Sequence, residues 1–210
     1  MKLLQVGFNK CGTRTLHLFL EANGWKSGHW DRGAIAETLK QNLDMNDPNP
    51  LGRYADYDAL FDVTFFGDET YFDAAHHFKA LDVAYPDARF VLNTRNVDDW
   101  IISRFNHARL AERFAHYHDL RSDAEIAAHW RREWYHQHSS VLEHFKGRPE
   151  KLLVFDIDRH GAEELIEFLG DRTLDPSLYT VSGQTTAKNK TYDSTFGKKR
   201  LKVGRVFVGW

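Results

Sequence analysis

Short, almost continuous apolar runs recur along the chain and predict buried strands. They span residues 3–8, 59–63, 89–94 and 151–155. Runs of this length, rich in β-branched and aromatic residues, are typical of strands that are covered on both faces of a parallel sheet. The pattern therefore predicts a central parallel sheet.

Longer segments with apolar residues at helical spacing lie between these runs. Gly24 and Gly170 follow two of them as C-caps, Pro86 follows a third, and Asp31 is placed to cap a fourth. This alternation predicts an α/β chain with a three-layer, P-loop NTPase-like fold, in which helices flank the sheet. We expect helices over residues 13–23, 31–43, 70–84, 98–117, 122–145 and 161–169.

Composition narrows the class of protein. The 28 basic and 30 acidic residues of the 210 give a net charge of −2, which does not favour nucleic acid as a partner. The single cysteine excludes an intrachain disulfide, and no run reaches the roughly 18 apolar residues of a membrane span. We therefore expect one cytoplasmic domain over residues 1–210, with a helical block at 98–146 and a basic tail at 188–210.

The loop after the first predicted strand has the features of an anion site. Gly7 and Gly12 have the spacing of a P-loop, between a strand and a helix N-terminus, where backbone N–H groups and the helix dipole attract phosphate. A P-loop would continue with Lys-Ser or Lys-Thr, but Thr13-Arg14 follows here and the lysine is Lys10. The pattern indicates a phosphate loop that is not built to hold Mg-ATP.

A second anion site is predicted where the 89–94 strand ends. Arg95 leaves the strand, and Ser103 follows eight residues later, in the next predicted helix. A guanidinium and a hydroxyl are suitable donors to a phosphate. Because ligands of doubly wound sheets bind beyond the carboxyl ends of the strands, two such sites imply a ligand with two separated phosphate groups.

Together, the two motifs resemble those of sulfotransferases that use 3'-phosphoadenosine 5'-phosphosulfate (PAPS). The first motif reads Pro-Lys-x-Gly-Thr-[Thr/Ser]-x-Leu in that family and spans residues 9–16 here. The second reads Arg-[Asn/Asp]-Pro-x-Asp with a serine eight residues after the arginine, and spans residues 95–103 here. Asn9 and Val97 replace the usual prolines. The resemblance covers about residues 2–170.

The resemblance implies roles for these residues. Lys10 would stabilise charge on the leaving phosphate, and Arg95 and Ser103 would hold the 3'-phosphate. The products would be adenosine 3',5'-bisphosphate and a sulfated small-molecule or carbohydrate acceptor, with no metal required. The 5'-phosphosulfate would be held by the loop and helix start, comprising Lys10, Cys11, Gly12, Thr13, Arg14 and Thr15.

Sulfuryl transfer to a hydroxyl or amine also needs a base near the acceptor. Members of this family use His, Glu or Asp in or after the second strand region. Asp62, at the end of the 59–63 run, is our first candidate, with a structural carboxylate as the alternative. Asp68 and Glu69 come next, and His29, after the first helix, is a further candidate.

Two other functions remain open from the sequence. A P-loop kinase or NTPase would use Asp156, at the end of the last apolar run, as a Walker B carboxylate for magnesium. A phosphonucleotide-binding protein without activity would keep the phosphate loop and lack the catalytic base.

The pairs His76-His77 and His136-x-His138 lack a third ligand at a convincing spacing, so we expect solvated helix faces there. The basic run at 198–205 is expected to be solvated, or to close over the 3'-phosphate.

Overall fold

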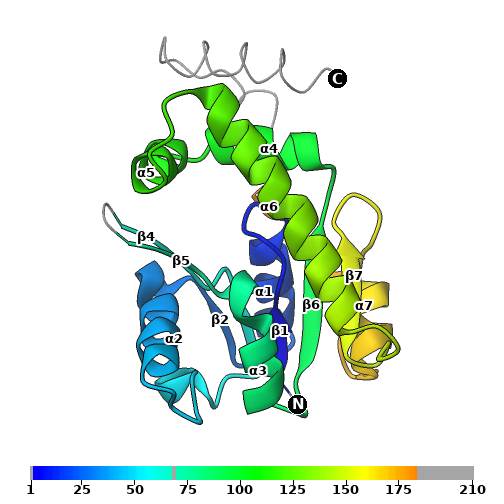
Figure 1. Ribbon diagram of the computed structural model, residues 1–210. Helices are drawn as coiled ribbons and strands as arrows, with labels where there is room; N and C mark the ends of the chain where they lie inside the picture. Colours follow the sequence, from blue (N-terminus) through cyan, green and yellow to red (C-terminus); the bar gives the residue numbers. More distant parts are fainter. Residues whose placement is uncertain (1, 68–69, 184–210) are drawn as a thin grey trace.

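The computed structural model of the protein describes residues 2–67 and 70–183 (Figure 1). Asp68, Glu69 and the basic tail at 188–210 lie outside the described residues, so their predicted roles stay predictions. Within the described ranges, no helix combines the length and the apolar character needed to cross a bilayer.

A five-stranded sheet forms the centre of the fold. β1 (Leu3–Gln5) lies in its middle, and the strand order is β2-β3-β1-β6-β7, with every neighbouring pair parallel. All four predicted strands are present, and the predicted parallel sheet is confirmed. The other strands are β2 (Ser27–His29), β3 (Ala59–Phe61), β6 (Arg89–Thr94) and β7 (Leu152–Asp156).

Helices cover both faces of this sheet, as Figure 1 shows. Neighbouring strand residues point to opposite faces: Leu4 packs with α2 (Ala34–Asp44), α3 (Phe78–Ala84) and α6 (Asp123–His144). Leu3 packs on the other face with helices α1 (Thr13–Ala22) and α7 (Ala162–Leu169). The three-layer α/β architecture is therefore confirmed.

β2 was not predicted because it lacks an apolar signature. β2 reads Ser-Gly-His, and a Cβ at Gly28 would come within 2.9 Å of the Leu60 side chain, so close packing rather than hydrophobicity defines it.

The helix expected over 70–84 is wrong in its first half. β5 (Tyr71–Asp73) pairs antiparallel with β4 (Thr64–Phe66), and Asp73 then caps a 3₁₀ turn before α3.

The helical block after β6 closes the carboxyl end of the sheet. The helix expected over 98–117 is two helices, α4 (Val97–Phe105) and α5 (Leu110–Tyr117), separated by a turn in which Ala108 has a φ of 40°. Asp31 is likewise not a cap, because α2 begins after Gly33, whose φ is 92°. An aromatic cluster fills the block, made by Phe8, Trp100, Phe105, Phe114, Trp130 and Trp134.

Candidate active site

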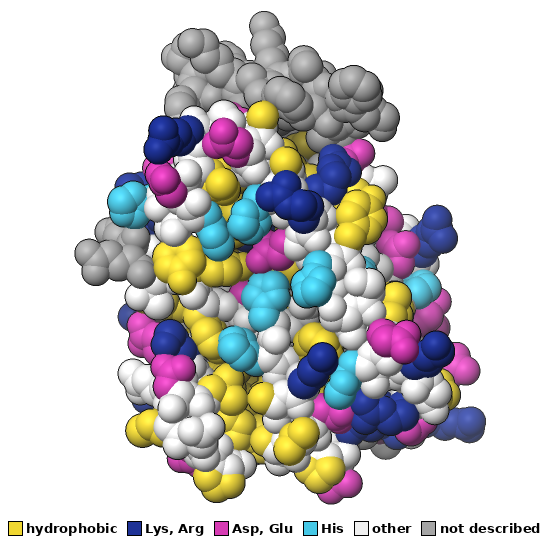
Figure 2. Space-filling model, in the orientation of Figure 1, with side chains coloured by type: hydrophobic (Ala, Val, Ile, Leu, Met, Phe, Trp, Pro, Cys, Tyr) yellow, Lys and Arg dark blue, Asp and Glu magenta, His cyan; other side chains and the backbone are white. Residues whose placement is uncertain are grey.

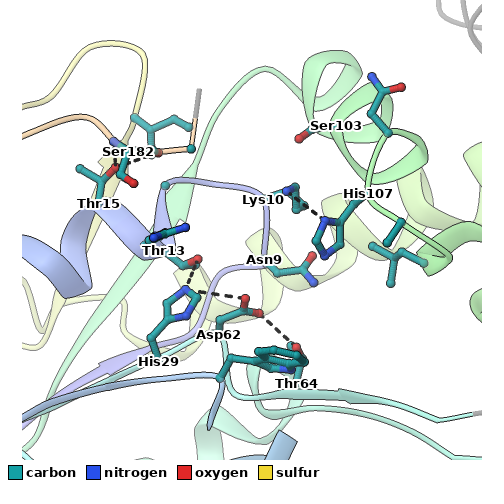
Figure 3. A pocket seen from close by; sticks show the side chains of 18 of the residues that line it. Asn9, Lys10, Thr13, Thr15, His29, Asp62, Thr64, Ser103, His107 and Ser182 are labelled. Carbon is teal, nitrogen blue, oxygen red and sulfur yellow. Dashed lines mark hydrogen bonds and ion pairs between the residues drawn. The ribbon is translucent and has the colours of Figure 1, made fainter. Parts of the chain in front are cut away.

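A cavity of about 1070 Å³ opens beyond the carboxyl ends of β1, β3 and β6. This is where ligands bind in open α/β sheets. Figure 3 shows Lys10 after β1, His29 at the end of β2 and Asp62 after β3 lying together at this end of the sheet. The predicted site residues that line it are Lys10, Gly12, Thr13, Arg14, Thr15, His29, Asp62, Arg95 and Ser103.

The loop between β1 and α1 is shaped by a buried amide from the neighbouring strand. Asn93, in β6, donates from Nδ2 to the carbonyls of Phe8 (3.0 Å) and Cys11 (2.8 Å). A Cβ at Gly7 would lie only 2.3 Å from the Asn93 Oδ1 atom, so the loop can approach β6 only through a glycine. Sequence reasoning gave Asn93 no role, although it fixes the loop.

Other side chains bind the remaining carbonyls of the loop. Gln5 Nε2 donates to the Gly7 carbonyl at 2.6 Å, and Trp100 Nε1 donates to the Asn9 carbonyl at 2.9 Å. Arg95 Nη1 lies 3.4 Å from the Lys10 carbonyl. Because the carbonyls of residues 7–11 all accept from side chains, the unused hydrogen-bonding groups of this backbone are N–H donors, which suit an anion.

Lys10 sits at the tip of this loop in a left-handed conformation, with a φ of 63°. Its Nζ atom lies 3.4 Å from Nδ1 of His107, in the turn between α4 and α5 (Figure 3). Burial lowers the pKa of the Lys10 ammonium, and the nearby Asp62 carboxylate opposes this shift. Lys10 is therefore a partly desolvated cation that points into the cavity.

Cys11 differs from the other loop residues because its side chain is fully buried in the aromatic cluster. Burial raises the pKa of this thiol far above its usual range. Only its backbone is available to a ligand. We expect a thiol reagent at pH 8 to modify the folded protein on the order of 100-fold more slowly than the denatured chain. Equal rates in buffer and in guanidinium chloride would contradict the burial of Cys11.

Asp62 follows β3 directly and is held in an unusual conformation, with a φ of 51°. Its N–H donates to Gln5 Oε1 at 2.5 Å, and its Oδ1 atom accepts from the Thr64 hydroxyl at 3.0 Å. Burial raises the pKa of the Asp62 carboxyl, although Thr64 and the surrounding cations oppose the shift. A carboxylate with a raised pKa is a stronger base, in keeping with the role predicted for Asp62.

His29, at the end of β2, lies beside Asp62. Its Nε2 atom is 3.1 Å from the Thr13 hydroxyl and 3.7 Å from Asp62 Oδ2 (Figure 3). Burial, His17 and Arg14 together lower the pKa of His29 to about 4. His29 is therefore neutral at pH 7, so its approach to Asp62 is a polar contact rather than an ion pair.

Arg95 and Ser103 form the second predicted anion site. Arg95 leaves β6 toward the loop, and its buried Nε atom has no hydrogen-bond partner among the described residues. Ser103 faces the same cavity from α4 (Figure 3). A buried guanidinium N–H and a hydroxyl in the same cavity fit a phosphate oxygen, since a buried donor left unpaired is costly.

Thr15 differs from its neighbours because its hydroxyl already has partners. The Thr15 Oγ1 atom accepts from the Ser182 N–H at 2.9 Å and lies 3.3 Å from the Ser182 carbonyl. The chain around Ser182 therefore borders the start of α1. Ser182 and Gly183 also line the cavity, and no motif or apolar pattern in the sequence indicated this.

Asp156 and the histidine pairs have structural partners. Asp156 accepts from the Asp158 N–H at 3.0 Å and does not line the cavity. Histidines gather on the face over α3, α5 and α6 (Figure 2). His76 Nε2 lies 3.0 Å from Glu133, and His138 Nε2 lies 2.9 Å from the Thr94 hydroxyl. His76 and His136 are exposed, as expected for solvated helix faces, whereas His77 and His138 are half-buried.

Sequence reasoning missed one side of the cavity. It is made by the turn after β2, by β4, by the turn between α4 and α5, and by α5, none of which carries a motif. The only local signal was Gly33, which ends a polar turn. The residues concerned are Trp30, Arg32, Phe65, Phe66, His107 and Arg113.

A family model described as a sulfotransferase domain matches residues 2–116, which run from β1 to α5 and include both anion sites. No curated protein matches the chain.

Proposed function

The chain belongs to the sulfotransferase family, and from this premise we propose that it transfers a sulfuryl group from PAPS to a hydroxyl or amine of a small-molecule or carbohydrate acceptor. The observation that carries the proposal is the convergence of two anion sites on one cavity. The loop of residues 7–12 supplies one, and Arg95 with Ser103 supplies the other. Two anion sites in one cavity suit a donor that carries a phosphosulfate and a distinct 3'-phosphate.

Each residue then has a defined task. The backbone N–H groups of the loop and of the α1 N-terminus hold the phosphosulfate, assisted by Thr13 and Arg14. Asp62 takes the proton from the acceptor as its oxygen or nitrogen bonds to sulfur. The bond between sulfur and the bridging phosphate oxygen breaks, and Lys10 stabilises the negative charge that develops on this oxygen. His29, being neutral, orients Asp62 and Thr13.

Specific observations disfavour the two alternatives. A kinase would need Asp156 at the phosphates, but this carboxylate caps its own turn outside the cavity. A binding protein without activity would have no use for Asp62. This carboxylate is held in a left-handed conformation beside Lys10, with a raised pKa. Strained and desolvated groups of this kind concentrate at reactive sites.

Thermal unfolding in the presence of nucleotides tests the donor. We expect adenosine 3',5'-bisphosphate at about 100 times its Kd to stabilise the protein by roughly 2.7 kcal/mol, and Mg-ATP to stabilise it less. Arg95→Gln should reduce the shift, because it removes the donor with the orphaned Nε. Arg132→Gln, an exposed arginine outside the cavity, is the matched control. Stabilisation by Mg-ATP alone would overturn the proposal.

A further inference from the structure

The turn after β2 carries backbone strain at the edge of the cavity. Trp30, Asp31 and Arg32 have φ values of 60°, 44° and 54°, and Gly33 follows at 92°. Three consecutive non-glycine residues in this region are costly, at about 1–3 kcal/mol each. Such strain persists only where the surroundings impose it, and it commonly serves a site.

Three hydrogen bonds hold the turn in place. The Trp30 N–H donates to the Phe61 carbonyl at 3.1 Å, which extends the pairing of β2 with β3. The Gly33 N–H donates to the Trp30 carbonyl at 2.9 Å. The Tyr54 hydroxyl donates to Asp31 Oδ2 at 2.6 Å. Asp31 therefore anchors the turn, and the residues on either side of it are presented to the cavity.

Trp30 and two phenylalanines of β4, Phe65 and Phe66, form an aromatic wall of the cavity. Trp30 lines the cavity although 48% of its surface is exposed, so packing does not explain its position. Phe65 and Phe66 of β4 line the same cavity, and Phe65 packs against Gly33. An exposed indole and two phenyl rings that line the same cavity offer stacking surfaces for a flat ring, whether aryl or pyranose.

The charge of the cavity is unbalanced. Among the described residues, six cationic side chains line it: Lys10, Arg14, Arg32, Arg95, Arg109 and Arg113. Three carboxylates face them, from Asp62, Asp99 and Asp158.

The proposed donor accounts for half of these cations, namely Lys10, Arg14 and Arg95. On the other side of the cavity, Arg109 pairs with Glu112 at 3.1 Å, and Arg113 donates to the Phe66 carbonyl at 3.2 Å. Arg32 is exposed, lines the cavity, and its side chain makes no hydrogen bond or ion pair with another described residue. Its guanidinium is therefore available to a ligand.

We propose that this wall selects acceptors that combine a ring with an anionic group, such as a carboxylate, with Trp30 stacking on the ring and Arg32 binding the anion. This inference rests on the proposed function and specifies its acceptor. The same chemistry occurs in hydroxyaryl carboxylates and in uronic acid sugars. In both, the hydroxyl to be sulfated would face Asp62 while the anion lies near Arg32.

Acceptors that differ only in charge test the proposal. The probes are 4-hydroxyphenylacetate, its neutral amide and tyramine, with phenyl glucuronide and phenyl glucoside as the sugar pair. We expect kcat/KM to favour the anion in each series by about tenfold, the size of one charge-assisted contact. Arg32→Gln should remove this preference and leave the neutral acceptors within about twofold, whereas Arg132→Gln should retain it. The series with the higher kcat/KM, hydroxyaryl or sugar, identifies the class of ring that the acceptor carries.

Trp30→Gly provides a second readout that does not depend on turnover. Glycine tolerates a φ of 60° and removes the indole, so we expect an unchanged or raised Tm. Binding of the anionic probe, measured by calorimetry with adenosine 3',5'-bisphosphate present, should weaken by about tenfold. A preference for neutral or cationic acceptors, or a fall in Tm with unchanged acceptor binding, would overturn this inference. Failure of the unmutated protein to bind adenosine 3',5'-bisphosphate would instead refute the proposed function.

Discussion

Lys10→Met should lower kcat for sulfuryl transfer by about 10²- to 10³-fold, the usual loss when one preorganised group that stabilises developing charge is removed. The Kd for adenosine 3',5'-bisphosphate should change far less, because the loop amides and Arg95 remain. Lys10 is the cation at the tip of the loop, and burial makes its charge act through a poorly solvated medium. Stopped-assay kinetics with labelled PAPS and calorimetry with the bisphosphate measure the two quantities.

The pH dependence gives an independent check on Lys10. The ammonium must be protonated to act, so activity should fall as the pH rises through its pKa. Burial lowers this pKa, and the alkaline limb should therefore begin below the usual lysine value near 10.4. Lys79→Met, on the exposed side of α3, is the matched control. An equal loss of kcat in both variants, or a large loss of bisphosphate affinity with kcat retained, would contradict the role of Lys10.

Asp62→Asn should lower kcat by about 10²- to 10⁴-fold, the range attributed to general-base catalysis. Asparagine keeps the size of the side chain and an oxygen that can accept from Thr64, so the loss isolates the ability to take a proton. The base acts when it is deprotonated, and activity should fall as the pH drops through its pKa. Because burial raises the pKa of Asp62, this acid limb should lie above the usual aspartate value near 3.9.

His29→Gln separates Asp62 from its neighbour. The pKa of His29 is about 4, so this imidazole is neutral throughout the physiological range. Its replacement should reduce kcat moderately through the lost contact with Thr13, and should leave the acid limb in place. The opposite pattern, in which His29→Gln abolishes the limb and Asp62→Asn retains it, would assign the base to His29.

The sheet and its helices could be predicted because their sequences carry periodic apolar patterns. Leu3 and Leu4 pack on opposite faces of β1, so the run that contains them has to be apolar throughout. β2 could not be found in this way, since Gly28 is defined by close packing against Leu60. β5 has three residues and runs directly into the next turn, because Asp73 both ends the strand and caps that turn. A strand this short was not separated from the helix pattern that follows it.

The meeting of the loop and Arg95 in one cavity was predictable because both directly follow strands, and parallel strands bring their carboxyl ends together. Ser103 lies in α4, the helix that follows β6, and lines the same cavity. The acceptor side depends on turns whose course is set by tertiary contacts. His107 contacts Lys10 from the turn that follows the end of α4 at Phe105, and Trp30 lines the cavity from a turn with positive φ values.

The hydrogen bonds of the loop carbonyls have a consequence for how the protein opens. Gln5, Asn93 and Trp100 belong to the sheet and to the aromatic cluster, and each must leave its place before the loop can lose its shape. Local opening of this loop therefore requires nearly the same free energy as unfolding of the core. This loop therefore belongs to the same cooperative unit as the core, and we expect it to keep its shape when no ligand is bound.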